Sequence, residues 1–115
     1  MLPGVFNQVQ VIRNGLDKAW VNHQVITNNI ANAETPGYTA QRIEARAAGE
    51  GVKDGSTRWE YEIAMSADPA NANGNNVNIE KEMAELAKNS LAYNALVRKI
   101  AMELRQIEAA INEGR

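Results

Sequence analysis

A periodic row of apolar residues near the C-terminal end constrains this chain more than any other feature. From Asn78 to Asn112 the row advances in alternating steps of four and three residues, and only Ser90 interrupts it. Such spacing keeps one stripe of side chains on one side of a helix. No proline falls within it, so we expect one helix of about 35 residues, roughly 50 Å long. The stripe consists of Ile79, Met83, Leu86, Tyr93, Val97, Ile100, Leu104, Ile107 and Ile111.

The N-terminal stretch repeats the same period. Pro3 stands where a first helical turn tolerates proline, and Gly15 costs about 1 kcal/mol of helix propensity relative to alanine. We predict one helix over residues 6–31, softest near Gly15. Its apolar stripe consists of Val5, Val9, Ile12, Leu16, Ala19, His23, Ile26, Ile30 and Ala33.

The other side of this N-terminal helix is unusually rich in amides. Ordinary solvated helix faces carry Lys and Glu instead. Two interpretations stay open: a merely polar face, or a surface that is wet when alone and hydrogen-bonded when packed. The amides are Asn7, Gln8, Gln10, Asn14, Asn22, Gln24, Asn28 and Asn29.

Two long helices joined by a short middle segment predict a mainly α fold. We expect the helices to pack as an antiparallel helical hairpin or coiled coil. The middle should be short and β-rich or irregular. The segments are residues 1–38, 39–76 and 77–115, which together form one structural domain.

The C-terminal helix has more apolar surface than one partner helix can cover. A second strip runs along its far side through Ala84, Leu91, Ala95, Met102 and Ala109. A helix that is apolar on several sides is buried on several sides, so we expect other subunits to cover what the N-terminal helix leaves open. The residues expected to pack helices or join subunits are Val9, Ile12, Leu16, Ile26, Ile30, Met83, Leu86, Leu91, Tyr93, Leu96, Val97, Ile100, Leu104 and Ile107.

The middle segment has a weaker pattern. Residues 45–51 are rich in Ala and Gly and are expected to be loose and mobile. Residues 57–63 alternate, with Trp59, Tyr61 and Ile63 on one side, which predicts a half-buried strand or hairpin arm. No partner strand is obvious, so the alternative of a lone exposed arm is kept. Residues 68–76 are turn-rich.

Between the first helix and the middle lies ANAETPGY, residues 31–38. Asn32 can adopt the left-handed geometry that ends a helix, and Pro36 pushes Thr35 out of helical space. Pro36 and Gly37 fit a type II turn with Gly37 in the positive-φ position. Local chemistry thus predicts a helix stop followed by a rigid bend.

The same string resembles the N-terminal signature of the flagellar rod and hook family of axial proteins. The matching residues are Ala31, Asn32, Thr35, Pro36, Gly37 and Tyr38. Two runs further along resemble the proximal rod members of that family. They comprise Gly74, Asn75, Val77, Asn78, Ile79, Glu82 and Met83, then Ala87, Asn89, Ser90, Leu91, Tyr93, Asn94 and Ala95. The chain departs from these relatives at Asn78, where they often have Asp, and in its short middle segment.

The resemblance implies a structural subunit of the proximal rod of the bacterial flagellar basal body. Its terminal helices would interlock into a torque-transmitting shaft in the periplasm. Such subunits leave the cell unfolded through the flagellar type III apparatus, without signal cleavage. The implied partners are copies of itself, other rod subunits such as FlgC, an adaptor similar to FliE, and base proteins of the MS ring and export gate. The alternatives are a FlgC-like axial protein, or a soluble helical adaptor or secretion chaperone.

Composition argues against other functions. The net charge is −2 without a basic run, so we expect no nucleic acid partner. No apolar run is long enough to span a membrane, and the N-terminus lacks the features of a cleaved secretory signal. There is no cysteine, and the single histidine, His23, lies on an apolar stripe where packing or hydrogen bonding explains it. We therefore expect no enzyme activity, no catalytic residues, no metal site and no cofactor.

Overall fold

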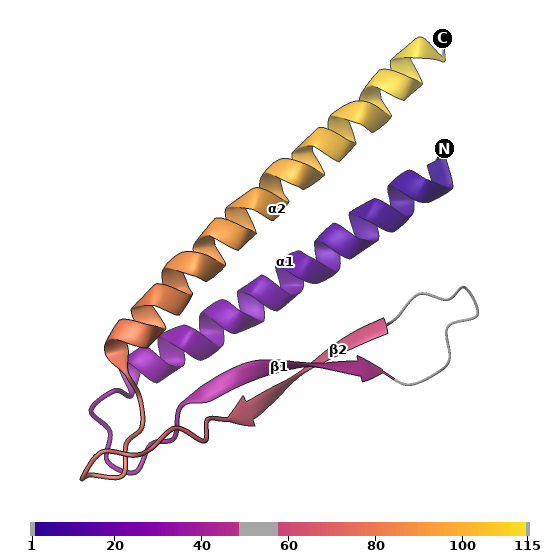
Figure 1. Ribbon diagram of the computed structural model, residues 1–115. Helices are drawn as coiled ribbons and strands as arrows, with labels where there is room; N and C mark the ends of the chain where they lie inside the picture. The colour runs from indigo at the N-terminus through magenta and orange to yellow at the C-terminus, as the bar shows by residue number, and fades with distance from the viewer. Residues whose placement is uncertain (1, 49–57, 115) are drawn as a thin grey trace. The chain divides into compact units, whose positions relative to one another are not determined.

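The computed structural model describes residues 2–48 and 58–114. It contains two long helices, α1 (Leu2–Ala31) and α2 (Ile79–Glu113), and an antiparallel hairpin between them in sequence, β1 (Gln41–Ala48) and β2 (Arg58–Met65) (Figure 1). The predicted mainly α fold with a short β-rich middle is confirmed. The chain forms two compact units, and both helices run from one into the other. We call Met1–His23 with Ala87–Arg115 the helix-pair unit, and Gln24–Leu86 the hairpin unit.

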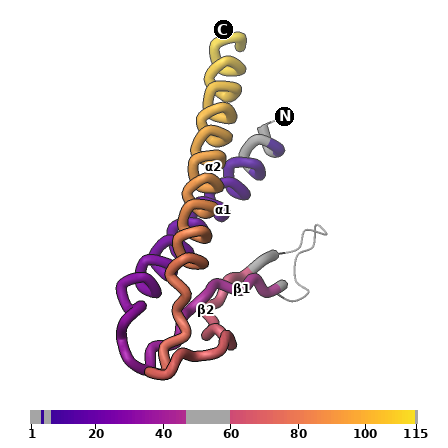
Figure 2. The backbone as a smooth tube through the Cα atoms, turned by 60° about the vertical axis from the view of Figure 1, so that its left-hand side comes forward, coloured from indigo at the N-terminus to yellow at the C-terminus, as the bar shows by residue number. Residues whose placement is uncertain are grey.

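Helix α1 begins at Leu2, before the predicted start, and continues through Gly15 without a break. Within the helix-pair unit α1 and α2 run in opposite directions (Figure 2). A β-carbon placed on Gly15 would lie 3.1 Å from Leu96 Cδ1. The glycine therefore allows close approach of α2, and its propensity cost is offset by this packing. Among the α1 residues whose side chains the structure describes, the buried apolar ones are Ile12, Ala19, Val25 and Ile26.

Helix α2 begins as predicted. The Lys81 amide donates to Asn78 Oδ1 at 3.2 Å, which makes Asn78 the N-cap, and Glu80 and Glu82 occupy the positive first turn. Among the residues that the structure describes, none in α2 is buried.

The side of α2 that meets α1 differs from the predicted stripe. The prediction placed one residue in every seven, Met83, Ser90, Val97 and Leu104, on this side. In the structure the less exposed residues instead include the ones directly before them, Glu82, Asn89, Leu96 and Glu103. Leu86, Ile100 and Ile107 belong to both sets. The seam is thus rotated by about one residue around α2.

Specific contacts to α1 account for this rotation. Asn89 Nδ2 donates to the Ala19 carbonyl at 2.8 Å, and Leu96 fills the space beside Gly15. With its amide nitrogen turned toward the carboxylate, Gln8 donates to Glu103 Oε1 at 2.8 Å. Polar and steric complementarity, rather than apolar content alone, therefore sets which side of α2 faces α1.

The hairpin corrects two expectations about the middle segment. Residues 45–48 are not loose, because they belong to β1, and β2 is not a lone arm, because it pairs with β1 from Gln41↔Met65 to Ala48↔Arg58. The rest of the expected mobile stretch, residues 49–51, lies outside the described residues. The side of β2 that carries Tyr61 and Ile63 was expected to be half-buried. This expectation is wrong for Ile63, which is 57% exposed. A two-stranded sheet has no second layer of its own to cover it.

The close contact at Gly15 gives a direct test of the helix pair. Gly15→Leu should destabilise the protein by about 1–3 kcal/mol, because the added side chain must displace Leu96. Gly4→Leu is the control, since a β-carbon there meets nothing within 4 Å and leucine has the higher helix propensity. Urea unfolding followed by circular dichroism measures both. Equal stability of the two variants would contradict the packing described.

Candidate functional site: a joint of buried asparagines and an open helix edge

The chain leaves α1 through a turn held by its own side chains. The backbone amide of Asn32 donates to the Asn28 carbonyl at 3.1 Å. The side-chain Nδ2 of Asn32 donates to the same oxygen at 2.8 Å. Thr35 Oγ1 donates to Asn32 Oδ1 at 3.1 Å. The predicted left-handed Asn32 is wrong, since no described residue other than glycine has positive φ. The asparagine side chain, not a left-handed backbone, ends the helix.

The bend that follows has the predicted type II geometry. The Tyr38 amide donates to the Thr35 carbonyl at 3.2 Å, which closes the turn around Pro36 and Gly37. Gly37 has φ of 75°, as the third position of such a turn requires. The proline and glycine therefore act as local sequence chemistry predicts.

A segment from the other end of the hairpin unit closes onto this bend. The Asn75 side chain is almost fully buried (1% exposed), and its Nδ2 donates to the carbonyls of Asn32 and Thr35, both at 2.8 Å. Gly37 donates its backbone amide to the Asn73 carbonyl at 2.9 Å. A β-carbon on Gly74, whose φ is 82°, would lie 3.3 Å from Gly37 Cα. The two sequence motifs are thus in backbone contact.

The neighbouring Asn76 connects this closure to the hairpin. Its Oδ1 accepts from the Ala40 amide at 2.6 Å, just before β1. Its Nδ2 donates to the carbonyls of Ser66 and Asp68, just after β2, at 3.3 and 3.1 Å. One side chain therefore ties together the two ends of the hairpin.

Asn29 in the hairpin unit is fully buried, with 0% exposure. Its Oδ1 accepts from the Tyr38 hydroxyl and the Gln41 amide, both at 2.9 Å. Its Nδ2 donates to the Gln41 carbonyl at 2.7 Å and to Glu82 Oε2 at 3.2 Å. This amide joins α1, the bend, the start of β1 and the first turn of α2. We call Asn29, Asn32, Asn75 and Asn76 the asparagine joint.

Tyr38 is kept neutral in this setting. Burial raises the pKa of the Tyr38 hydroxyl, and the nearby Glu82 carboxylate raises it further, although the hydrogen bond from Asn28 works in the opposite direction. A protonated hydroxyl is what the bond to Asn29 Oδ1 requires, because that oxygen can only accept.

Sequence reasoning missed the role of Asn29 and placed it on the wet amide face. The signal was present in its spacing, because Asn29 follows Val25 and Ile26 by four and three residues and so shares their buried side of α1. The side-chain roles of Asn75 and Asn76 had no comparable signal, since their bonds to the bend and to Ala40 join residues 36 to 43 positions apart.

The residues expected to pack helices or join subunits divide into two groups. Some lie partly or fully inside: Val9, Ile12, Leu16, Ile26, Ile30, Leu86, Leu96, Ile100 and Ile107. The others are exposed: Met83, Leu91, Tyr93, Val97 and Leu104.

Within the helix-pair unit α2 has exposed apolar side chains on two sides. Val97 and Leu104, one heptad apart, share one side and are 42% and 54% exposed, whereas Leu91 and Met102 lie on another side and are 72% and 55% exposed. We call Val97 and Leu104 the open edge of α2. Exposed large apolar side chains that recur along one helix are typical of an interaction surface.

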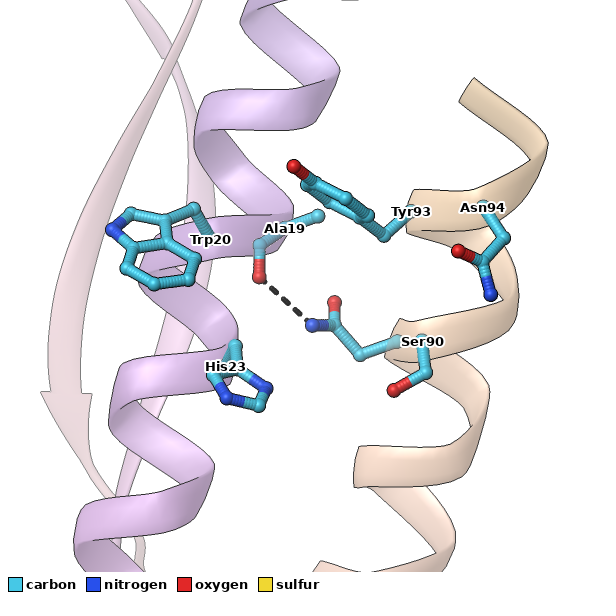
Figure 3. A pocket seen from close by; sticks show the side chains of 7 residues that line it. Ala19, Trp20, His23, Ser90, Tyr93 and Asn94 are labelled. Atoms are coloured by element: carbon cyan, nitrogen blue, oxygen red, sulfur yellow. Dashed lines mark hydrogen bonds between the residues drawn. The ribbon is translucent and has the colours of Figure 1, made fainter. Parts of the chain in front are cut away.

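A groove between α1 and α2 in the helix-pair unit carries aromatic rings (Figure 3). Trp20 and His23 come from α1, with ring centroids 5.9 Å apart, and Tyr93 comes from α2. Trp20 is 56% exposed. His23 is partly buried, as its place on the stripe predicts. Ser90 and Asn94 also line the groove.

Metal and membrane chemistry find no support in the described part of the chain. No group of three or more His, Cys, Asp or Glu residues there could hold a metal ion. Over the same residues, neither helix combines the length and apolar character that a membrane span needs.

Comparisons with known proteins agree with this arrangement. Residues 10–39, which include most of α1 and the bend, match the family described as flagella basal body rod protein. The chain is 33% identical to the flagellar basal body rod protein FlgB of Bacillus subtilis (strain 168), over 93% of this chain and 95% of that protein. It is 28% identical to FlgB of Aquifex aeolicus (strain VF5), over 85% and 86%, and 25% identical to FlgB of Yersinia enterocolitica, over 79% and 83%.

Two terminal helices that pack together and a TPGY bend after the first define an axial protein of the flagellar rod type. Within that class, the chain belongs to the FlgB family of flagellar basal body rod proteins. It is therefore a structural subunit of the proximal rod in the basal body, and not an enzyme.

The contact between the two glycines predicts unequal effects of the same substitution. Gly37→Ala should cost about 1–2 kcal/mol, because alanine at positive φ is strained but meets nothing within 4 Å. Gly74→Ala should cost more, because the same strain is joined by a clash with the Gly37 backbone. Thermal unfolding of the two variants measures the difference. Equal losses of stability in the two variants would show that the close approach of the two segments contributes nothing to stability.

The bonds of Asn29 predict a charge-specific defect. Asn29→Asp should destabilise the protein by about 3 kcal/mol at neutral pH, because a buried carboxylate would replace the donor that faces the Gln41 carbonyl and Glu82. Adding Glu82→Gln should recover part of the loss, and lowering the pH should do the same by protonating the new carboxylate. The single variant Glu82→Gln is the control. Unfolding curves that give no recovery in the double variant would rule out this direct contact.

Proposed function

We propose that the terminal helices join neighbouring rod subunits, with the open edge of α2 as the principal contact. The observation that supports this is the lack of any buried residue in the described length of α2, although it is 35 residues long. Helix α1 covers one side of it, through Asn89 and Leu96 in the helix-pair unit. The apolar side chains of the open edge are left to other chains.

The free energy of burying the exposed apolar side chains of α2 is of the size that subunit association requires. Burying a side chain such as Leu91, Met102 or Leu104 contributes about 1.5–3 kcal/mol. Several such contacts with several neighbours can offset the cost of association. A single subunit would then be held weakly and the assembled rod strongly, because each added neighbour covers further apolar surface.

The asparagine joint has a mechanical role in this proposal. Its hydrogen bonds fix the end of α1 and the start of α2 to the hairpin within one compact unit. The residues 1–38 and 77–115 supply the axial helices, and residues 39–76 supply the arm. A rigid joint lets interlocked helices transmit torque, because load on a helix does not unfold the bend.

The resemblance to rod proteins supports a set of neighbours. We propose contacts with copies of this chain, with FlgC, with an adaptor similar to FliE, and with base proteins of the MS ring and export gate. We also propose delivery to the periplasm by the flagellar type III apparatus, without signal cleavage. The absence of cysteine suits a chain that is threaded unfolded through a narrow channel.

Charges placed on the open edge test this proposal in cells. Val97→Glu with Leu104→Glu should abolish swimming and flagellum formation, because unpaired carboxylates would be buried between subunits. The control is Ala92→Glu with Gln106→Glu, which adds the same charge at exposed positions away from that edge. Both purified proteins should keep the wild-type helix content by circular dichroism, because all four sites are exposed.

Normal swimming of the Val97 and Leu104 variant, at a normal protein level, would contradict the proposed contact. Loss of swimming in the control as well would show that added charge, rather than its position, causes the defect.

A further inference from the structure

Charge is divided unevenly between the two compact units. Residues 24–86 contain ten acidic and five basic residues, whereas residues 1–23 and 87–115 contain four acidic and seven basic residues. The hairpin unit therefore has a net charge of −5 and the helix-pair unit +3, which together give the −2 of the chain. A nearly neutral protein thus consists of two parts of opposite sign.

The positive charge of the helix-pair unit lies partly on an apolar surface. Arg98 and Arg105 are one heptad apart, so they share one side of α2. Leu91, one heptad before Arg98, and Met102, three residues before Arg105, lie on that side too and are 72% and 55% exposed. Both arginines are exposed, and neither makes an ion pair or hydrogen bond with any residue that the structure describes. We call these four residues the basic strip.

The hairpin unit carries a matching surface of opposite charge. Glu80 lies in the first turn of α2 between Ile79 and Met83, which are 50% and 53% exposed. Ala33, the neighbour of Glu34, lines the same open groove as Ile79 and Glu80. Glu34 and Glu80 are exposed and have no ionic or hydrogen-bond partner in the described part of the chain. We call Glu34, Ile79, Glu80 and Met83 the acidic strip.

We propose that the acidic strip of one subunit docks on the basic strip of a second copy of this chain. Each strip offers two apolar side chains and two unpartnered charges, and the charges have opposite signs. Both halves of the contact are present on one chain, which favours a second copy over a different protein. The proposal rests on the assembly role given above and adds a partner and an orientation to it.

The orientation follows from the charges. Two basic strips or two acidic strips repel each other, which disfavours a two-fold dimer in which like strips face each other. An acidic strip on a basic strip is a contact between two different surfaces. Repeated from copy to copy, such a contact builds a ring where the rotation between copies closes and an open helical polymer where it does not. The open form is the one that a rod requires.

Charge reversal tests the proposal with purified full-length protein. One variant carries Arg98→Glu with Arg105→Glu, and the other carries Glu34→Lys with Glu80→Lys. Each alone should self-associate about tenfold more weakly than wild type in sedimentation experiments at low salt, because both of its strips then have the same sign. Mixed in equal amounts they should associate again, since each supplies the charge that the other lacks.

The matched control is Arg13→Glu with Lys99→Glu. It changes the total charge as much as the first variant, at exposed sites outside both strips, and should associate like wild type. Circular dichroism of every variant excludes misfolding as the cause of a loss. High salt should weaken wild-type association, because it screens exposed charges.

Folded variants that stay monomeric when mixed would overturn the proposal. So would a wild type that remains monomeric and binds only a different rod protein. Either result is separable from a failure of the assembly role, because the open-edge variant with Val97→Glu and Leu104→Glu reports on that role by swimming alone.

Discussion

The hairpin unit depends on two buried amide side chains whose hydrogen bonds are fully used. Asn29 and Asn75 have almost no exposed surface, yet each bonds to backbone groups from segments far away in sequence. A buried amide without partners costs more than most single contacts provide. The segments must therefore meet in one arrangement, because only that arrangement supplies the partners. Among the described residues, no buried side-chain nitrogen or oxygen lacks one.

The helix-pair unit is specified in a different way. Its contact between α1 and α2 relies on a glycine that admits Leu96 and on Asn89, which accepts from Asn22 at 3.0 Å and donates to Ala19. These contacts choose one side of α2 and leave the apolar remainder exposed. The contrast between the two units has a physical explanation. Satisfied polar groups give the hairpin unit a definite structure by itself, whereas exposed apolar groups give the helix pair a reason to associate.

Local chemistry predicted much of this structure from the sequence. The two helices and the type II turn at Gly37 each follow from residues close in sequence. Strand β1 was missed because its alanine-rich end gives little β signal and its pairing partners are 10 to 24 residues away, from Ala48↔Arg58 to Gln41↔Met65. The burial of Asn29 was missed because amides are ordinarily exposed. Where the outcome depends on a distant partner, a single sequence holds too little information to decide it.

The rotated seam of α2 shows how one helix can serve two partners. The predicted stripe centres on Leu86, Tyr93, Ile100 and Ile107 and extends to Met83, Val97 and Leu104 on one flank. Helix α1 contacts the opposite flank, at Asn89, Leu96 and Glu103, so the stripe is only half covered. A centred seam would have hidden Val97 and Leu104 within the subunit. Because polar and small residues draw α1 to one side, a heptad pattern that would ordinarily bury one helix pair leaves a continuous apolar edge for a neighbour.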